Sequence, residues 1–361
     1  MGQSVESVLR PPCLAEQTLR MWVPLRAQSS LAPPSAVLDV LMKGWSVSTL
    51  RTYGTGLRNL HRFCDSRVPR VPEGDRSPIT EAVLLEFIVH CAGRYSSSAV
   101  RNYVYGIKAW HMLHRVPWRI PETVLTPAFR AARRMAPVWV KRSPRDPVTV
   151  ETMTTVLAHL DLSVSLDAAV WACMTTTFWS VSRLGEFTVK TQTSFRVEEH
   201  VKRSDVRMDV PHGRARHVVT SFWLPSTKTK PAEGESTHWA AQEGPCDPRA
   251  ALLNHFAVNN PAMNAHLFSW RNDSGDIRPL TSKAFLKRVN DALEDVGEPP
   301  IQGHCLRIGG VLEWLLRGNS FEVVKVMGRW SSDAFLVYIR RQASILAPSA
   351  LQAQARPKSR G

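Results

Sequence analysis

The chain has 361 residues, 43% of them hydrophobic, and carries a formal net charge of +15. This length is enough for two ordinary domains, and the hydrophobic content permits a sizeable core. No stretch reaches the roughly 18 apolar residues that a membrane helix needs, and Glu6 and Pro11-Pro12 interrupt any N-terminal signal sequence. We therefore expect an intracellular protein that makes no membrane contact.

The positive charge is concentrated in the front part of the chain. Residues 1–145 contain 21 Lys and Arg against 9 Asp and Glu, whereas residues 146–361 contain 25 against 22. A surplus of this kind favours a polyanionic partner, with nucleic acid as the first candidate. The alternative is that the charge serves only solubility.

The cysteines show no metal or disulfide spacing. None of the six forms a C-x-x-C pair, and several lie in apolar helical patterns, so we expect reduced and mostly buried thiols. His111 and His114 have helical ligand spacing, but no carboxylate or cysteine cluster joins them. There is also no Walker loop or dinucleotide fingerprint. We therefore expect no metal and no cofactor.

Residues 1–37 are predicted to be flexible, and residues 38–130 to form a helical domain. Apolar residues recur every three or four positions after Ser46 and again after Ser96, and the hydroxyls of Ser96, Ser97 and Ser98 are suitable N-caps for the later helix. Basic residues lie between the apolar positions, which is typical of a helical face that binds a phosphate backbone. They are Arg51, Arg58, Arg62, Arg101 and Lys108. An ordinary solvated face is the alternative.

A basic linker is predicted over residues 131–146. Two prolines stand among its basic residues, which favours an extended, electropositive segment that could cross DNA. Its candidate DNA contacts are Arg133, Arg134, Lys141 and Arg142.

The second domain is predicted over residues 147–346, mainly α with a small β-sheet, before a basic disordered tail at 347–361. Helical patterns cover 150–160, 166–187, 248–257 and 282–296, and three short helices are expected over 304–317, 321–327 and 333–340. Period-two patterns predict strands at 206–210 and 218–224, with a further strand at 237–240.

Two candidate functional groups precede the last helices. Arg183, followed three residues later by Glu186, stands at the end of a long apolar pattern. A buried arginine needs a partner, which is either an internal ion pair with Glu186 or an anion in a cleft. Lys228 follows a strand on a turn, where a lysine can be an ordinary surface residue or can deliver a proton to a site. Lys230 is an alternative for the same role.

The last four groups are His304, Arg307, Trp330 and Tyr338. His304 and Arg307 lie three residues apart, so they share one face of a helix. Arginine can grip two phosphate oxygens and histidine can move protons near neutral pH. An indole N–H can donate to a phosphate oxygen. A tyrosine hydroxyl can act as a nucleophile when cations activate it.

In this order, the motifs resemble those of the tyrosine recombinase (phage integrase) superfamily. The matching positions are Arg183 with Glu186, Lys228, His304, Arg307, Trp330 and Tyr338. The phrase from Gly328 to Arg340 is most similar to recombinases of eukaryotic mobile elements of the Crypton and DIRS kind. The resemblance covers about residues 40–345 and implies a SAM-like core-binding domain before a catalytic domain of the DNA breaking-rejoining fold. One departure is that Trp330 precedes Tyr338 by eight residues, where many bacterial members have nine.

The resemblance implies a site-specific recombinase or integrase that needs neither metal nor ATP. Tyr338 would attack a phosphodiester of double-stranded DNA and form a 3′-phosphotyrosyl link. Arg183 and Arg307 would bind the phosphate, Lys228 would protonate the leaving oxygen, and His304 and Trp330 would assist. A homotetramer on DNA is implied, and the nucleus if the host is eukaryotic. The alternatives are a domesticated DNA-binding protein without strand exchange, an enzyme like the type IB topoisomerases, and a helical structural protein.

Overall fold

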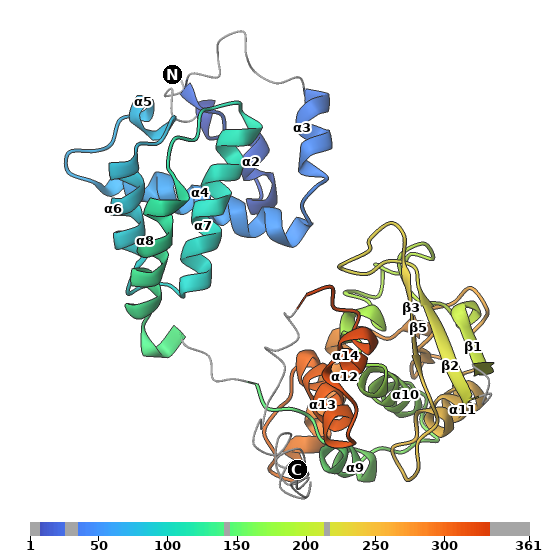
Figure 1. Cartoon of the computed structure of the whole chain (residues 1–361). Helices are drawn as coiled ribbons and strands as arrows, with labels where there is room; N and C mark the ends of the chain where they lie inside the picture. Colours follow the sequence, from blue (N-terminus) through green and yellow to red (C-terminus); the bar gives the residue numbers. More distant parts are fainter. Residues whose placement is uncertain (1–7, 26–34, 141–144, 213–216, 333–361) are drawn as a thin grey trace, which may run out of the picture. The chain divides into compact units, whose positions relative to one another are not determined.

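The computed structural model describes residues 8–25, 35–140, 145–212 and 217–332. The chain divides into two units, Met1–Ser143 and Pro144–Gly361 (Figure 1). No helix among the described residues is long and apolar enough to cross a membrane. Tyr338, Lys141, Arg142 and the predicted tail lie outside the described residues.

The first unit is helical throughout its described part. Ser96 caps α7 as predicted, and Ser46 caps α4, because each hydroxyl accepts a hydrogen bond from a backbone N–H three residues later. The elements of this unit are η1 (Ala15–Gln17), α2 (Thr18–Met21), α3 (Ser35–Met42), α4 (Val47–Ser66), α5 (Glu73–Arg76), α6 (Glu81–Cys91), α7 (Ser97–Leu113), α8 (Glu122–Arg134) and η3 (Val138–Val140).

Helices α4 and α7 form the centre of this unit and approach each other closely. A Cβ added at Gly106 would lie 2.7 Å from Cα of Tyr53, and one added at Gly56 would overlap Tyr103. The two glycines therefore allow backbone-to-backbone contact, and the apolar faces of both helices fill the core around it.

The segment before residue 38 differs from the prediction of a flexible region. Residues 8–25 contain η1 and α2, and Leu9 and Leu19 are fully buried. Arg58 of α4 donates to Thr18 Oγ1 (2.9 Å) and to the carbonyl oxygen of Cys13 (2.5 Å). Burial of the two leucines and these hydrogen bonds order the segment.

Two further arginines, Arg10 and Arg76, form ion pairs within the first unit. Arg76 is 1% exposed and contacts Asp65 (2.8 Å), Glu73 (3.0 Å) and the carbonyl oxygen of Val71. Arg10 pairs with the same two carboxylates. The two histidines of the H-x-x-H spacing also have backbone partners, since His111 contacts Ile107 and Ile79 and His114 contacts Leu19.

The second unit surrounds one buried helix with shorter helices and small sheets. The fold class is confirmed as mainly α with a small antiparallel sheet. Its elements are α9 (Val150–Ala158), α10 (Ser165–Trp179), η4 (Leu184–Glu186), η5 (Arg203–Asp205), β1 (Val206–His212), β2 (His217–Leu224), β3 (Glu235–Trp239), α11 (Pro248–Asn259), β4 (Ser269–Arg271), β5 (Ile277–Pro279), α12 (Ser282–Glu294), α13 (Gly303–Leu316) and α14 (Phe321–Met327).

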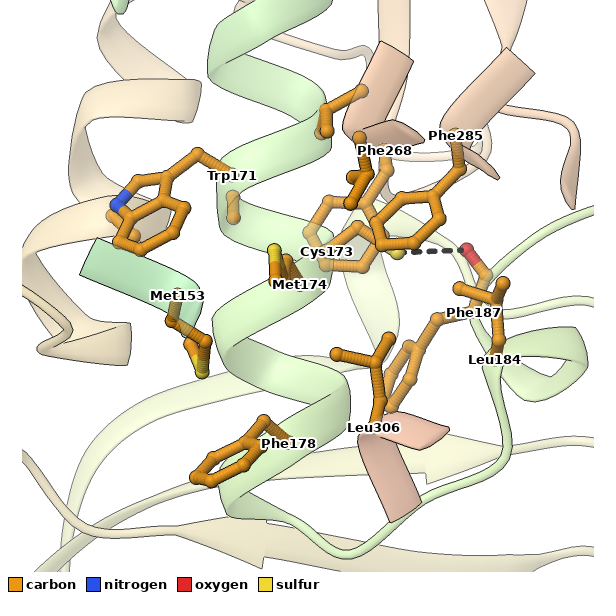
Figure 2. Packing of buried hydrophobic residues seen from close by; sticks show 14 of the residues in the cluster. Met153, Trp171, Cys173, Met174, Phe178, Leu184, Phe187, Phe268, Phe285 and Leu306 are labelled. Atoms are coloured by element: carbon orange, nitrogen blue, oxygen red, sulfur yellow. Dashed lines mark hydrogen bonds between the residues drawn. The ribbon is translucent and has the colours of Figure 1, made fainter. Parts of the chain in front are cut away.

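Helix α10 is buried continuously from Asp167 to Trp179. Figure 2 shows Met153, Phe268, Phe285 and Leu306 packed around it from other elements. A helix that is apolar on all sides must lie inside the domain, so α10 is a fixed support for whatever follows its C-terminus.

The strands form two separate sheets. Strands β1, β2 and β3 are antiparallel in that order, with Phe222 of β2 opposite Thr237 of β3. Strands β4 and β5 pair separately and were not predicted, because each has only three residues. All six cysteines are free and five of them are buried, as predicted.

Candidate active site

Arg183 stands just past the end of α10, where the chain turns sharply. The prediction of a helix up to residue 187 is wrong beyond Trp179, because Val181 adopts a left-handed backbone (φ +51°) while its side chain is fully buried. The chain resumes with Arg183 as the residue before η4. This turn directs Arg183 and Glu186 from the buried helix towards the site.

Arg183 and Glu186 form a capping arrangement. Arg183 donates from Nη1 to Glu186 Oε1 (2.9 Å), and its backbone N–H donates to Glu186 Oε2 (2.9 Å). The Glu186 side chain is only 6% exposed, but that of Arg183 is 24% exposed. The internal ion pair therefore exists, and it leaves part of the Arg183 guanidinium accessible.

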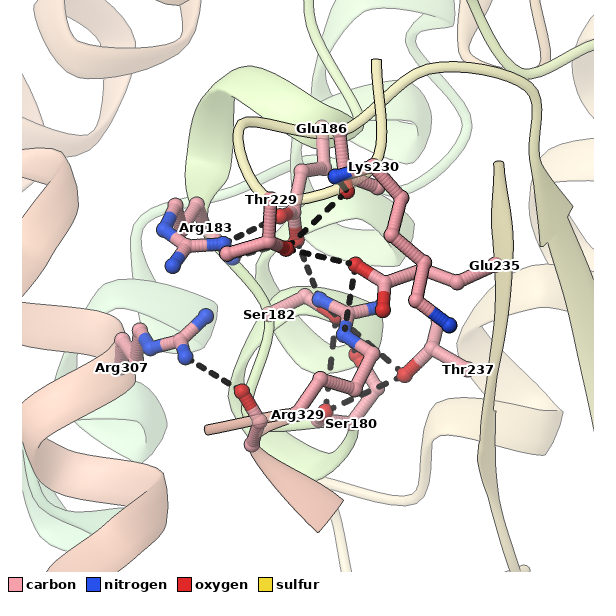
Figure 3. Close-up of polar contacts among 12 residues, drawn as sticks. Ser180, Ser182, Arg183, Glu186, Thr229, Lys230, Glu235, Thr237, Arg307 and Arg329 are labelled. Atoms are coloured by element: carbon pink, nitrogen blue, oxygen red, sulfur yellow. Dashed lines mark hydrogen bonds and ion pairs between the residues drawn. The ribbon is translucent and has the colours of Figure 1, made fainter. Parts of the chain in front are cut away.

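Three guanidinium groups determine the charge of Glu186. Burial alone would raise the pKa of its carboxyl, but Arg329, Arg183 and Arg307 outweigh burial and lower the pKa below its usual value. The carboxylate is therefore ionised at neutral pH. Figure 3 shows Arg183 and Arg307 on the same side of the cluster, with their guanidinium groups near each other.

Helix α13 presents His304 and Arg307 on one face. Arg307 is fully buried and donates from Nη2 to the carbonyl oxygen of Gly328 (2.5 Å). Further along α13, a Cβ at Gly309 would overlap the carbonyl oxygen of Val148 and lie 2.9 Å from the Phe178 ring. This close approach holds α13 against α10 and thereby fixes the position of Arg307.

His304 is half-buried in a cationic environment. Burial lowers the pKa of its imidazole, and Arg145, Arg307 and Arg183 lower it further, to about 4. The ring is therefore neutral at physiological pH and can accept a hydrogen bond or proton on one nitrogen while it donates from the other.

The turn Gly328-Arg329-Trp330 covers the arginine of α13. The Trp330 ring lies over the Arg307 guanidinium, with 4.0 Å between Cζ and the ring centroid. A Cβ at Gly328 would overlap the same ring, so only glycine permits this fold-back. Trp330 therefore lies in the same cluster as Arg307 and contacts it.

Arg329 also belongs to this cluster, although the sequence did not indicate it. Its Nη2 contacts Glu186 Oε2 (2.5 Å) and Ser182 Oγ (3.4 Å), and its Nε lies 3.7 Å from Glu235 Oε1. The sequence signal was a basic residue between a glycine and the candidate tryptophan. That signal did not indicate that the side chain points inwards.

Lys228 lies on the hairpin between β2 and β3 and is exposed, as is Lys230. The hairpin is closed by a hydrogen bond from Thr227 N to the Lys230 carbonyl oxygen (3.2 Å). Within the described residues, the Lys228 ammonium has no hydrogen bond or ion pair. The hairpin nevertheless reaches the cluster through Thr229, which donates to Glu235 Oε1 (3.3 Å).

The structure therefore brings four of the six candidate catalytic residues together. Arg183, His304, Arg307 and Trp330 meet around the turn at 328–330, and Lys228 is on the adjoining hairpin. Tyr338 lies outside the described residues. Among the described residues, no group of three or more His, Cys, Asp or Glu could hold a metal ion.

The predicted DNA-contacting residues of the first unit divide into three groups. Arg62, Arg101, Arg133 and Arg134 are exposed. Arg51 is also exposed but pairs with Glu16 (3.3 Å), and Lys108 pairs with Glu122 (3.1 Å). Arg58 holds the N-terminal segment and therefore differs from the predicted exposed face.

The predicted linker also differs from the structure at its start. Helix α8 continues to Arg134, so residues 131–134 are helical and not extended. Arg133 and Arg134 line an open hollow of about 670 Å³, together with Arg130, the N-cap Ser96 and the first residue of α7, Ser97. This is a concave basic surface within the first unit.

The comparisons with known proteins concern the fold. No protein-family model matches the sequence, and no curated protein is significantly similar to it. A crystal structure of XerH site-specific recombinase bound to palindromic difH substrate, a post-cleavage complex, is 14% identical and matches with a TM-score of 0.55 over 94% of both chains. The pre-cleavage complex of XerH with difH substrate is 13% identical, with a TM-score of 0.52 over 99% of this chain and 98% of that one. The chain therefore has the fold of the tyrosine recombinases.

Proposed function

We propose that this protein is a tyrosine recombinase that breaks and rejoins DNA strands through a covalent phosphotyrosyl intermediate. The single observation that carries the proposal is the convergence of Arg183 and Arg307, from two separate segments, around a neutral His304. Two guanidinium groups in one partly buried space suit the non-bridging oxygens of a phosphodiester. The shared fold with a DNA-bound recombinase supports the same assignment.

The roles follow from the chemistry of each group. Arg183 and Arg307 bind the phosphate and stabilise the charge that develops on its oxygens. Trp330 holds the Arg307 guanidinium from one side. His304, neutral at physiological pH, orients the phosphate and accepts or returns a proton. Lys228 on its hairpin protonates the leaving 5′-oxygen, and Tyr338 is the nucleophile.

Each step conserves one phosphate ester bond. The Tyr338 oxygen bonds to phosphorus as the bond to the DNA 5′-oxygen breaks, and that oxygen leaves with a proton. Attack by a 5′-hydroxyl then restores a phosphodiester and releases the tyrosine. The energy of the ester is kept throughout, so the reaction needs no nucleotide. The exposed arginines of the first unit would contact the DNA backbone, and exchange between two duplexes would use four copies of the chain.

The test uses a nicked duplex that loses a short fragment after cleavage and so traps the covalent complex. The wild-type protein should give an adduct that survives denaturing electrophoresis, and Tyr338→Phe should give none while binding DNA equally. Tyr95→Phe, which alters a tyrosine of the first unit, is the control. An adduct that persists in Tyr338→Phe removes Tyr338 from the role. DNA binding without an adduct on any sequence would favour a DNA-binding protein that lacks strand exchange.

A further inference from the structure

The backbone of Arg329 is unusual and its side chain is buried. Arg329 adopts a left-handed conformation (φ +58°), which is unfavourable for a residue other than glycine. Its side chain is only 9% exposed, and the residue follows Gly328, which caps the C-terminal end of α14. A strained backbone combined with a buried charge needs compensating contacts.

Those contacts are two carboxylates from different elements. Glu186 belongs to η4 and its side chain is 6% exposed; Glu235 begins β3 and its side chain is 10% exposed. Arg329 contacts Glu186 at 2.5 Å and Glu235 at 3.7 Å. The guanidinium therefore connects the segment after α10 with the hairpin that carries Lys228, as Figure 3 shows.

The charge of Glu186 is shared between two arginines. Arg183 contacts one carboxylate oxygen and Arg329 the other. With both present, the two arginines balance Glu186 and Glu235. Without Arg329, Arg183 would be the nearest counter-ion of the nearly buried Glu186, and the charge of the cluster would be one unit more negative. The field that Arg183 directs at an anion would then be weaker.

We infer that Arg329 is a positioning residue, which neutralises Glu186 so that the charge of Arg183 stays available to the scissile phosphate. It also ties the Lys228 hairpin to the same point through Glu235. This inference rests on the proposed function for its substrate, but the ion-pair arrangement that carries it is independent of the reaction. Arg329 acts through Glu186 and makes no contact with the phosphate in this scheme.

The experiment is a double-mutant cycle read by single-turnover cleavage of the nicked duplex. Arg329→Met should slow cleavage at least tenfold and leave DNA affinity within twofold. Adding Glu186→Gln to Arg329→Met should recover most of that loss, because the carboxylate that contacts Arg183 is then neutral; Glu235 lies farther from Arg329, at 3.7 Å, so its lost contact should account for the remainder. Arg329→Lys should be intermediate. If the fold-reduction in cleavage rate of the double variant equals the product of the reductions of the two single variants, the inference is overturned. It is also overturned if Arg329→Met cleaves as fast as the wild type.

A matched control separates this role from stability alone. Arg288 contacts Asp167 (2.7 Å) at the beginning of α10, opposite the end that leads to the site. Arg288→Met breaks a comparable ion pair in the same unit, so it should lower the unfolding midpoint and leave the cleavage rate of the folded protein unchanged. Equal slowing in Arg288→Met and Arg329→Met would mean that lost stability explains both, and would overturn the inference.

A second measurement does not depend on cleavage. Inorganic phosphate that binds the folded site should raise the thermal midpoint of the C-terminal unit. The rise should be smaller in Arg329→Met than in the wild type and should return in the double variant. If the wild type forms no adduct but this pattern holds, the proposed reaction fails and the positioning of Arg183 for an anion stands. An equal phosphate response in wild type and Arg329→Met overturns the inference in either case.

Discussion

Substitution of Gly309 tests whether the packing of α13 fixes the position of the candidate phosphate-binding residues. Alanine at this site gains about 1 kcal/mol of helix propensity relative to glycine. Its Cβ, however, would overlap the carbonyl oxygen of Val148 and lie 2.9 Å from the Phe178 ring. Because a backbone oxygen cannot rotate away, relief requires a shift of the helix itself. Overpacking of a core costs about 1–3 kcal/mol, and this contact belongs at the upper end.

The net expectation is a loss of about 2 kcal/mol, which lowers the midpoint of a unit of this size by about 4–8 °C. His304 and Arg307 would move with the helix, and a displacement near 1 Å can reduce a reaction rate about 100-fold. Differential scanning calorimetry measures the first effect and single-turnover cleavage the second. Gly185→Ala is the stability control, because no atom lies within 4 Å of its added Cβ. A Gly309→Ala protein as stable as the wild type would refute the close-packing argument.

The remaining predictions concern buried charge and acid stability. Arg76→Met should destabilise the first unit by about 1–3 kcal/mol, because the carbonyl oxygen of Val71 loses its buried donor, although Arg10 still pairs with Asp65 and Glu73; denaturant unfolding measures this, and a change below about 0.5 kcal/mol would contradict it. Burial lowers the pKa of His255 and His304 to about 4, so the unfolded chain binds more protons than the folded one below pH about 6.5. Stability should therefore fall as the pH drops from about 6.5 to 4, and a flat unfolding midpoint over that range would be the contrary result. Arg145→Gln should raise the pKa of His304, as followed by NMR titration, because it removes a nearby positive charge.

Strong periodic patterns in the sequence predicted most elements of the fold. Helix α14 has the predicted bounds of Phe321–Met327, and β1, β2 and β3 lie where the period-two patterns placed them. Such elements are decided by local side-chain alternation, which is visible in a sequence. The end of α10 is different, because the left-handed turn at Val181 follows from packing against other elements and interrupts an apolar pattern that continues to Phe187.

The site was predictable as a set of residue types and not as a set of contacts. The spacing of His304 and Arg307 fixes their common face on α13, so their proximity could be expected. The inward direction of Arg329 could not, since it depends on a positive φ and on two carboxylates far away in sequence. The structural role of Arg58 could not be predicted for a similar reason, because its hydrogen-bond partners belong to a segment with no clear helical periodicity.

The interior arginines of the first unit change what ionic strength should do to this protein. Arg10, Arg58 and Arg76 are bound to carboxylates or backbone oxygens, so in the proposed DNA complex they would displace no cations from the duplex. Each phosphate contact contributes about 0.9 to the slope of log affinity against log salt concentration. A slope calculated from the basic composition would therefore be too steep. The measured slope would reflect only the residues that contact the duplex. Its difference from the calculated slope would show how many basic residues stabilise the fold instead.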